Sequence, residues 1–204
     1  MQENEPKEIA VKGLVPTANI GAGMSIGYAC LCFAFWANAM GFTVPGGFGI
    51  AIGVVLIGFF VIYWVGGMYF LKQGNTISGA IFVTFACVFG LFSGGMNLTG
   101  AICTTLGVPF DYTILNISFV LAGLFLLFIL PSMTGFSKVD FCCFLFSGIG
   151  VAGFGVAGLG IAPDIANAIA GWSILIGGIC SYYGGVAAVL AASGKTLPKG
   201  APFF

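Results

Sequence analysis

The sequence predicts an all-α integral membrane protein, a bundle of six transmembrane helices with both termini in the cytoplasm. Its 204 residues are 59% hydrophobic and only 6% charged, whereas about 25% of residues are charged in a soluble domain. A spanning helix needs about 20 apolar residues, so the chain has room for six or seven spans. The third observation, the distribution of the lysines, favours six.

Polar and helix-breaking residues divide the apolar chain into its elements. We expect a polar tail over residues 1–15, a transmembrane domain over 16–193 that Pro16 opens, and a short tail over 194–204. An uncharged Pro- and Gly-containing link separates the first two spans, and prolines mark the later turns. The predicted spans are residues 18–40, 48–71, 77–98, 114–130, 141–161 and 165–192.

One polar turn stands out between the second and third spans. Lys72 can lie in the headgroup layer, and Gly74 can take the backbone angles at which a helix stops. Asn75 or Thr76 can then cap the next helix. The stretch therefore predicts a tight helix-to-helix turn at a membrane surface.

The lysines give the topology. Short cytoplasmic loops carry an excess of Lys and Arg, and only a six-span arrangement puts every lysine on one side. The protein is then a multi-pass protein of the plasma membrane with cytoplasmic termini. The lysines are Lys7 and Lys12 before the first span, Lys72 after the second, Lys138 after the fourth, and Lys195 and Lys199 after the sixth.

The composition excludes several classes of function. With a net charge of zero and no basic stripe, nucleic acid is not expected as a partner. Histidine is absent, and the seven cysteines lack the spacing of a zinc site or a disulfide framework. We interpret them as small buried hydrophobic residues. Without a nucleophile, base or metal set, we expect neither an enzyme nor a bound cofactor.

The spans hold hydroxyl and amide groups beside aromatic rings, and no ionisable residue near a predicted centre. Such groups can line a narrow path that replaces part of a small solute's hydration. The plainer alternative is that the hydroxyls bond to their own helices and the tyrosines lie at the membrane interface. Small residues on nearly every face of the fifth span indicate close packing on several sides. Both a tight bundle and an oligomer interface fit that pattern.

Two stretches resemble a known family. The run from Lys72 to Thr76, followed by Phe82, Thr84 and Phe85, is similar to the segment joining the second and third helices of the acetate uptake transporter family, the succinate–acetate permeases. Ala170-Gly171-Trp172, then Gly178, Tyr183 and Thr196-Leu197-Pro198, resembles that family's last helix and tail. The resemblance covers about residues 14–198.

The resemblance implies six spans, a homo-hexamer, and in each subunit a path for acetate and other small carboxylates, with succinate among them. It also implies a constriction of Phe, Tyr and Leu on helices one, three and five, at positions matching Ala22, Phe85 and Phe146. The pathway residues expected are Ala22, Ser25, Tyr28, Thr84, Phe85, Phe146 and Tyr183. The structural motif residues expected are Pro16, Gly21, Gly23, Gly74, Asn75, Thr76, Gly171 and Trp172.

The chain departs from the family pattern in the signature before the first helix, at an acidic position and at the constriction, where Ala22 stands for Phe, Phe85 for Tyr and Phe146 for Leu. Residues 13–19 keep only the second proline of the family's Asn-Pro-Ala-Pro-Leu-Gly-Leu signature, and Phe70 stands where an acidic residue is common. Phe85 lacks the hydroxyl of the tyrosine expected there. These departures leave open which solute is preferred.

Three hypotheses remain. The first is a transporter or channel for acetate and related carboxylates, which cross with a proton or as the neutral acid because a bare anion in an apolar constriction is costly. The second is a channel for a small neutral solute such as urea or ammonia. The third is a membrane scaffold that transports nothing.

Overall fold

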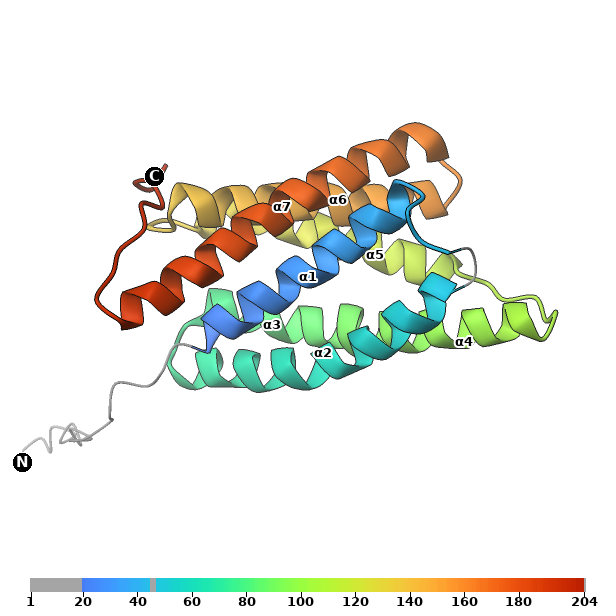
Figure 1. Cartoon of the computed structure of the whole chain (residues 1–204), viewed down its shortest axis with the longest axis horizontal. Helices are drawn as coiled ribbons and strands as arrows, with labels where there is room; N and C mark the ends of the chain where they lie inside the picture. The colour runs from blue at the N-terminus through green and yellow to red at the C-terminus, as the bar shows by residue number, and fades with distance from the viewer. Residues whose placement is uncertain (1–19, 45–46, 204) are drawn as a thin grey trace, which may run out of the picture.

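The computed structural model describes residues 20–44 and 47–203, and all of the regular structure in them is helical (Figure 1). Pro16, the tail over 1–15 and the altered signature over 13–19 lie outside the described residues. The helices are α1 (Gly21–Ala39), α2 (Gly47–Lys72), α3 (Thr76–Phe85), the π-helix η1 (Ala86–Ser93), α4 (Gly94–Thr105), α5 (Thr113–Ile129), the 3₁₀ turn η2 (Leu130–Ser132), α6 (Lys138–Gly158) and α7 (Pro163–Ala192).

These helices form six segments long and apolar enough to cross a membrane, as predicted. The third span is longer than expected because α3, η1 and α4 run on as one helix over Thr76–Thr105. The fifth begins earlier than expected, at Lys138, because the Ser137 side chain caps α6 by accepting a hydrogen bond from the backbone N–H of Asp140 at 3.2 Å.

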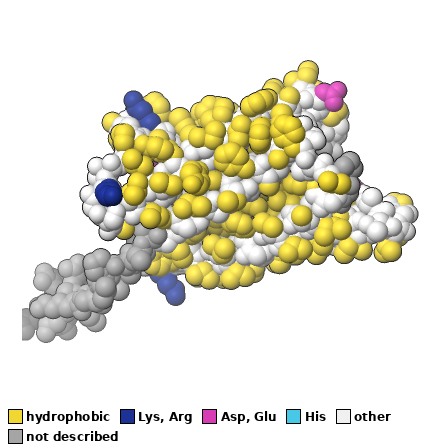
Figure 2. All heavy atoms as spheres, viewed as in Figure 1, with side chains coloured by type: hydrophobic (Ala, Val, Ile, Leu, Met, Phe, Trp, Pro, Cys, Tyr) yellow, Lys and Arg dark blue, Asp and Glu magenta, His cyan; other side chains and the backbone are white. Residues whose placement is uncertain are grey.

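The charged side chains lie at the two ends of the bundle. α2 ends at Lys72, α6 begins at Lys138, and the chain leaves α7 toward Lys195 and Lys199 at the same end (Figure 1). On the face that Figure 2 shows, lysine side chains lie at this end and an acidic side chain lies at the other. We call this end, at which the second, fourth and sixth spans finish, the lysine end.

The turn between the second and third spans has the expected local geometry. Gly74 has a φ of +76°, a left-handed conformation that suits glycine. The side chain of Asn75 then caps α3, since its Oδ1 accepts a hydrogen bond from the backbone N–H of Ser78 at 3.0 Å. Thr76 is the first residue of that helix.

Close helix packing uses the small residues of the fifth span inside the bundle. α6 lies against both α5 and α7, and α1 packs against α7. A methyl group added at Gly150 would lie 2.9 Å from the backbone nitrogen of Ile174 in α7, and one at Gly123 would lie 2.6 Å from the carbonyl oxygen of Gly148. Neither position has room for a side chain, so of the two arrangements that the glycines allowed, these contacts match the tight bundle.

Candidate functional site

A cavity of about 70 Å³, which we call the polar cavity, lies between the six spans, each of which contributes to its wall. Because about 10–15 Å³ of such volume holds one water molecule, the space suits a few water-sized groups. Its walls come from α1, α2, α3, α5, α6 and α7. The lining residues are Met24, Ser25, Tyr28, Tyr63, Ile81, Phe82, Phe85, Leu126, Asp140, Cys143, Phe144, Ser147, Ser181 and Gly184.

Three buried hydroxyl groups at this cavity lack a protein hydrogen-bond partner among the described residues: those of Tyr28, Tyr63 and Ser147. By contrast, Ser181 donates a hydrogen bond to the carbonyl oxygen of Ser25 at 2.9 Å. An unsatisfied buried hydroxyl costs about 1–3 kcal/mol, and nearly all buried polar groups in proteins are paired. All three groups can therefore bond to water or to a polar solute in the cavity.

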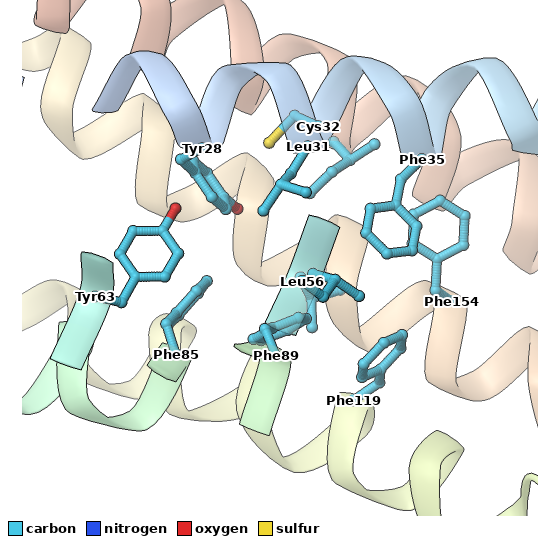
Figure 3. A pocket seen from close by; sticks show the side chains of 12 residues that line it. Tyr28, Leu31, Cys32, Phe35, Leu56, Tyr63, Phe85, Phe89, Phe119 and Phe154 are labelled. Atoms are coloured by element: carbon cyan, nitrogen blue, oxygen red, sulfur yellow. The ribbon is translucent and has the colours of Figure 1, made fainter. Parts of the chain in front are cut away.

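A second cavity of about 20 Å³, the neck cavity, adjoins the first, and the wall that it exposes is entirely apolar. The two cavities share Tyr28, Tyr63 and Phe85, which we call the ring triad. The ring of Phe85 packs edge-on against Tyr28 at 5.7 Å and against Tyr63 at 6.4 Å between centroids. In Figure 3 the phenol oxygens of Tyr28 and Tyr63 lie in the space between their helices.

Further rings continue the neck cavity beyond the ring triad (Figure 3). The ring of Phe85 stacks on that of Phe89 with 4.7 Å between centroids, and the ring of Phe89 stacks on that of Phe119 with 5.1 Å between centroids. The rings of Phe35 and Phe154, whose centroids lie 5.8 Å apart, complete this wall. Phe89 lies in the π-helix η1, and single π-turns of this kind within α-helices are frequent at functional sites.

Phe154 also lines a third hollow, at the end of the bundle opposite the lysine end. This hollow has a volume of about 340 Å³ and lies near Pro163, Asp164 and Asn167, where α7 begins. Successive cavities thus share lining residues from Asp140, at the start of α6, to Asp164, at the start of α7. The arrangement suits a path along the bundle that is polar, then apolar, then open.

The acidic residue of the polar cavity is fixed by two partners. Asp140 Oδ2 accepts a hydrogen bond from Ser137 Oγ at 2.6 Å and forms an ion pair with Lys199 Nζ at 2.8 Å. Asp111, in contrast, lies in the loop before α5, where Thr113 donates its backbone N–H to Oδ1 at 2.8 Å. Hydrogen bonds from Thr113 hold the pKa of the Asp111 carboxyl below its usual value.

The structure brings together some of the predicted pathway residues. Ser25, Tyr28 and Phe85 line the polar cavity, and Tyr28 and Phe85 line the neck cavity as well. Each comes from α1 or α3, the helices on which the resemblance placed two of the three constriction residues.

The other four predicted pathway residues line none of these three cavities. Ala22 is buried between α1 and α7, where its carbonyl oxygen would lie 3.0 Å from a methyl group added at Gly185. Tyr183 donates its hydroxyl to the carbonyl oxygen of Pro198 at 2.8 Å. Thr84 and Phe146 are half-buried next to residues that do face the polar cavity, Phe85 and Ser147, because neighbouring residues on a helix point about 100° apart.

Among the predicted motif residues of the spans, Gly171 packs closely, since a methyl group there would lie 2.8 Å from Met40 Cε. Trp172 is 55% exposed on the outer surface, with its ring 6.3 Å from that of Trp36. Gly21 is the first residue of α1, and Gly23 faces open space.

Sequence reasoning missed four residues of the site. Tyr63 and Ser147 are two of many hydroxyl-bearing residues in the spans, and nothing in the sequence marks them as cavity residues. Asp140 was detectable, because Ser137 and Asp140 have the spacing of a helix cap. Lys199 was assigned only to the tail. The seven cysteines are free thiols, with Cys32 and Cys143 buried at the cavities and Cys30 and Cys87 exposed.

Comparison with known proteins gives a structural match. No protein-family model and no curated protein matches the chain. Among solved structures, the chain is similar to the bacterial acetate channel SatP, with a TM-score of 0.74 and 21% sequence identity over 90% of this chain and 99% of that one. The chain therefore has the fold of that channel, in agreement with the family resemblance of its sequence.

Proposed function

We propose that the protein is a member of the acetate uptake transporter family that moves acetate and related small carboxylates across the plasma membrane. The observation that carries this proposal is the polar cavity, where the hydroxyls of Tyr28, Tyr63 and Ser147 have no protein partner among the described residues. A carboxylate of about four heavy atoms accepts hydrogen bonds from such hydroxyls, and charge-assisted bonds of this kind are about twice as strong as neutral ones. The similarity of fold to an acetate channel supports the same solute class.

The neck cavity bears on the form in which the solute crosses. Its exposed wall is apolar and its volume is about 20 Å³. An unpaired carboxylate in such surroundings is costly, so we propose passage as the neutral acid or together with a proton. The measurement is uptake of labelled acetate into proteoliposomes at a fixed membrane potential. Uptake that does not depend on an imposed pH gradient would contradict this step.

Orientation and assembly follow from the same proposal. The described lysines lie at one end of the bundle (Figure 2), so this end faces the cytoplasm under the positive-inside rule. A homo-hexamer is proposed from the family resemblance, and the apolar outer face of α2 offers a surface to lipid or to neighbouring copies. Native mass spectrometry in detergent tests the hexamer, and labelling of a cysteine introduced at Lys195 in sealed cells tests the orientation.

The hydroxyl groups give the decisive test of the solute. We expect Tyr28→Phe, Tyr63→Phe and Ser147→Ala each to weaken acetate uptake severalfold, because each removes one donor without changing the helix. Tyr182→Phe is the matched control, since Tyr182 lies on the outer surface and 53% of its area is exposed. Normal acetate uptake by all three cavity variants would refute this site.

One observation favours the neutral-solute channel as a second candidate. Asp140 is an acidic residue in the wall of the polar cavity, and a negative charge there disfavours an anion. Competition separates the two: propionate displaces acetate from a carboxylate carrier, and urea does not. The scaffold hypothesis predicts that the protein moves no solute. Absence of solute flux under every gradient would support it.

A further inference from the structure

The chain after α7 folds back over the lysine end of the bundle and meets the start of α6 (Figure 1). The hydroxyl of Tyr183 donates a hydrogen bond to the carbonyl oxygen of Pro198 in this segment at 2.8 Å. The backbone N–H of Val139 donates another to the carbonyl oxygen of Lys199 at 3.2 Å. The ring of Phe203 packs edge-on against that of Phe141 at 5.0 Å. Several independent contacts therefore fix residues 198–203 against α6 and α7.

This attachment places a cation next to Asp140, an acidic residue in the wall of the polar cavity, although Lys199 itself is not a lining residue. Lys199 Nζ lies 2.8 Å from Asp140 Oδ2, and the two side chains are 32% and 29% exposed. Asp140 belongs to the cavity wall. Both side chains are partly exposed and Asp140 also lines the cavity, so we call the edge of the cavity at this ion pair its mouth.

The two charges have opposite effects on a carboxylate. The negative charge of an unpaired Asp140 would repel an incoming anion. In the ion pair, the positive charge of Lys199 neutralises it. The ammonium group of Lys199 has three N–H donors, and one of them donates a hydrogen bond to Asp140 Oδ2. The remaining donors are available to a carboxylate that arrives at the mouth.

Other charged groups do not duplicate this effect. Lys138 Nζ lies over the ring of Phe203 at 5.2 Å from its centroid, and it is Lys199 rather than Lys138 that forms the ion pair with Asp140. The other acidic residues that the structure describes, Asp111 and Asp164, lie in or next to the loops at the opposite end.

We propose that Lys199 is a specificity-determining residue: the tail carries it to the mouth of the polar cavity, where it neutralises Asp140 and binds the carboxylate of the entering solute. This inference rests on the proposed function and deepens it. It adds a recognition residue outside the six spans and explains how a cavity with an acidic wall accepts an anion.

The test uses the purified full chain and the affinity for acetate, measured by ligand-observed NMR, so that orientation in a vesicle does not matter. Lys199→Met leaves Asp140 unpaired, and we expect it to weaken acetate binding about tenfold, because a full charge changes within a few ångströms of the ligand. Asp140→Asn leaves the cation in place and removes the competing negative charge, and we expect it to bind acetate severalfold more tightly than the wild type. Lys199→Arg keeps the charge and should retain most of the affinity.

The asymmetry between the two single variants is the critical readout. Both break the same ion pair, so a merely structural tail would weaken binding equally in both, and that result would overturn the inference. The double variant Asp140→Asn/Lys199→Met should recover part of the affinity lost in Lys199→Met, and no recovery would also overturn it. Lys195→Met and Asp111→Asn are the matched controls for a tail lysine and an exposed acid.

Failure of the proposed function gives a different result. If the wild type neither binds acetate nor takes it up in proteoliposomes, the carboxylate function is refuted, and the inference falls with it. If the wild type binds acetate and Lys199→Met binds it equally well, the inference alone is refuted. Thermal unfolding and size-exclusion profiles of each variant show whether a loss of binding reflects misfolding.

Discussion

Replacing Phe85 with alanine removes one of the three rings that both cavities share. Phe85 is 5% exposed and contacts three other rings, those of Tyr28, Tyr63 and Phe89, at centroid distances of 5.7, 6.4 and 4.7 Å. An aromatic pair contributes about 0.5–1.5 kcal/mol beyond area burial, so the lost contacts cost about 2–4 kcal/mol of folding stability. The variant should unfold at a lower temperature than the wild type but remain a bundle.

The functional effect of Phe85→Ala follows from the cavity volumes. The neck cavity of about 20 Å³ and the polar cavity of about 70 Å³ meet at this ring, so its loss joins them into one wider space. We expect uptake of succinate to rise severalfold relative to acetate. The assay is competitive uptake of the two labelled acids into proteoliposomes.

Phe146→Ala is the matched comparison. The resemblance placed Phe146 at the constriction, yet this residue lines neither cavity. The structure therefore predicts that Phe146→Ala leaves the ratio of succinate to acetate uptake unchanged. An unchanged ratio in folded Phe85→Ala, with an altered ratio in Phe146→Ala, would refute our position for the constriction.

Two further predictions concern stability. Asn75→Leu removes the cap of α3, which lowers the folding stability by about 1 kcal/mol. We expect the abundance of the protein in the membrane to fall while its affinity for acetate stays normal. An altered affinity at normal abundance would place Asn75 in the path. Gly123→Ala should lower the unfolding temperature strongly because the added methyl group meets the backbone of α6. Gly23→Ala is the control, since Gly23 faces open space and the change should leave the unfolding temperature nearly the same. Equal effects of the two changes would contradict the packing.

The number and order of the spans could be predicted from the sequence because hydrophobicity and charge act locally. Few polar residues interrupt the chain, and each lysine falls near an interruption. The end of the third span could not be predicted in this way. The helix runs through Leu98 to Thr105, and its hydroxyls bond within the helix, as Thr104 Oγ1 does to the carbonyl oxygen of Gly100 at 2.8 Å.

The cavity walls were harder to predict, because they depend on how far each helix is rotated. α2 is apolar on every face, so no amphipathic pattern distinguishes the buried Tyr63 from the exposed Trp64 beside it. A shift of one position on a helix turns a residue by about 100°, which separates Phe146 from Ser147. An alignment based on short motifs cannot fix each position to that accuracy.

The order of the cavities suggests an order in which a carboxylate loses its water. At the lysine end it meets the partly exposed Lys199, then the buried hydroxyls of Tyr28, Tyr63 and Ser147, and only then the apolar neck cavity. Its charge must be neutralised before the neck, because the exposed wall there gives no compensating hydrogen bond. A hydroxyl can accept a hydrogen bond from the neutral acid as well as donate one to the anion. Under the proposed function, the polar cavity is thus the place where a carboxylate takes up its proton while it remains bound.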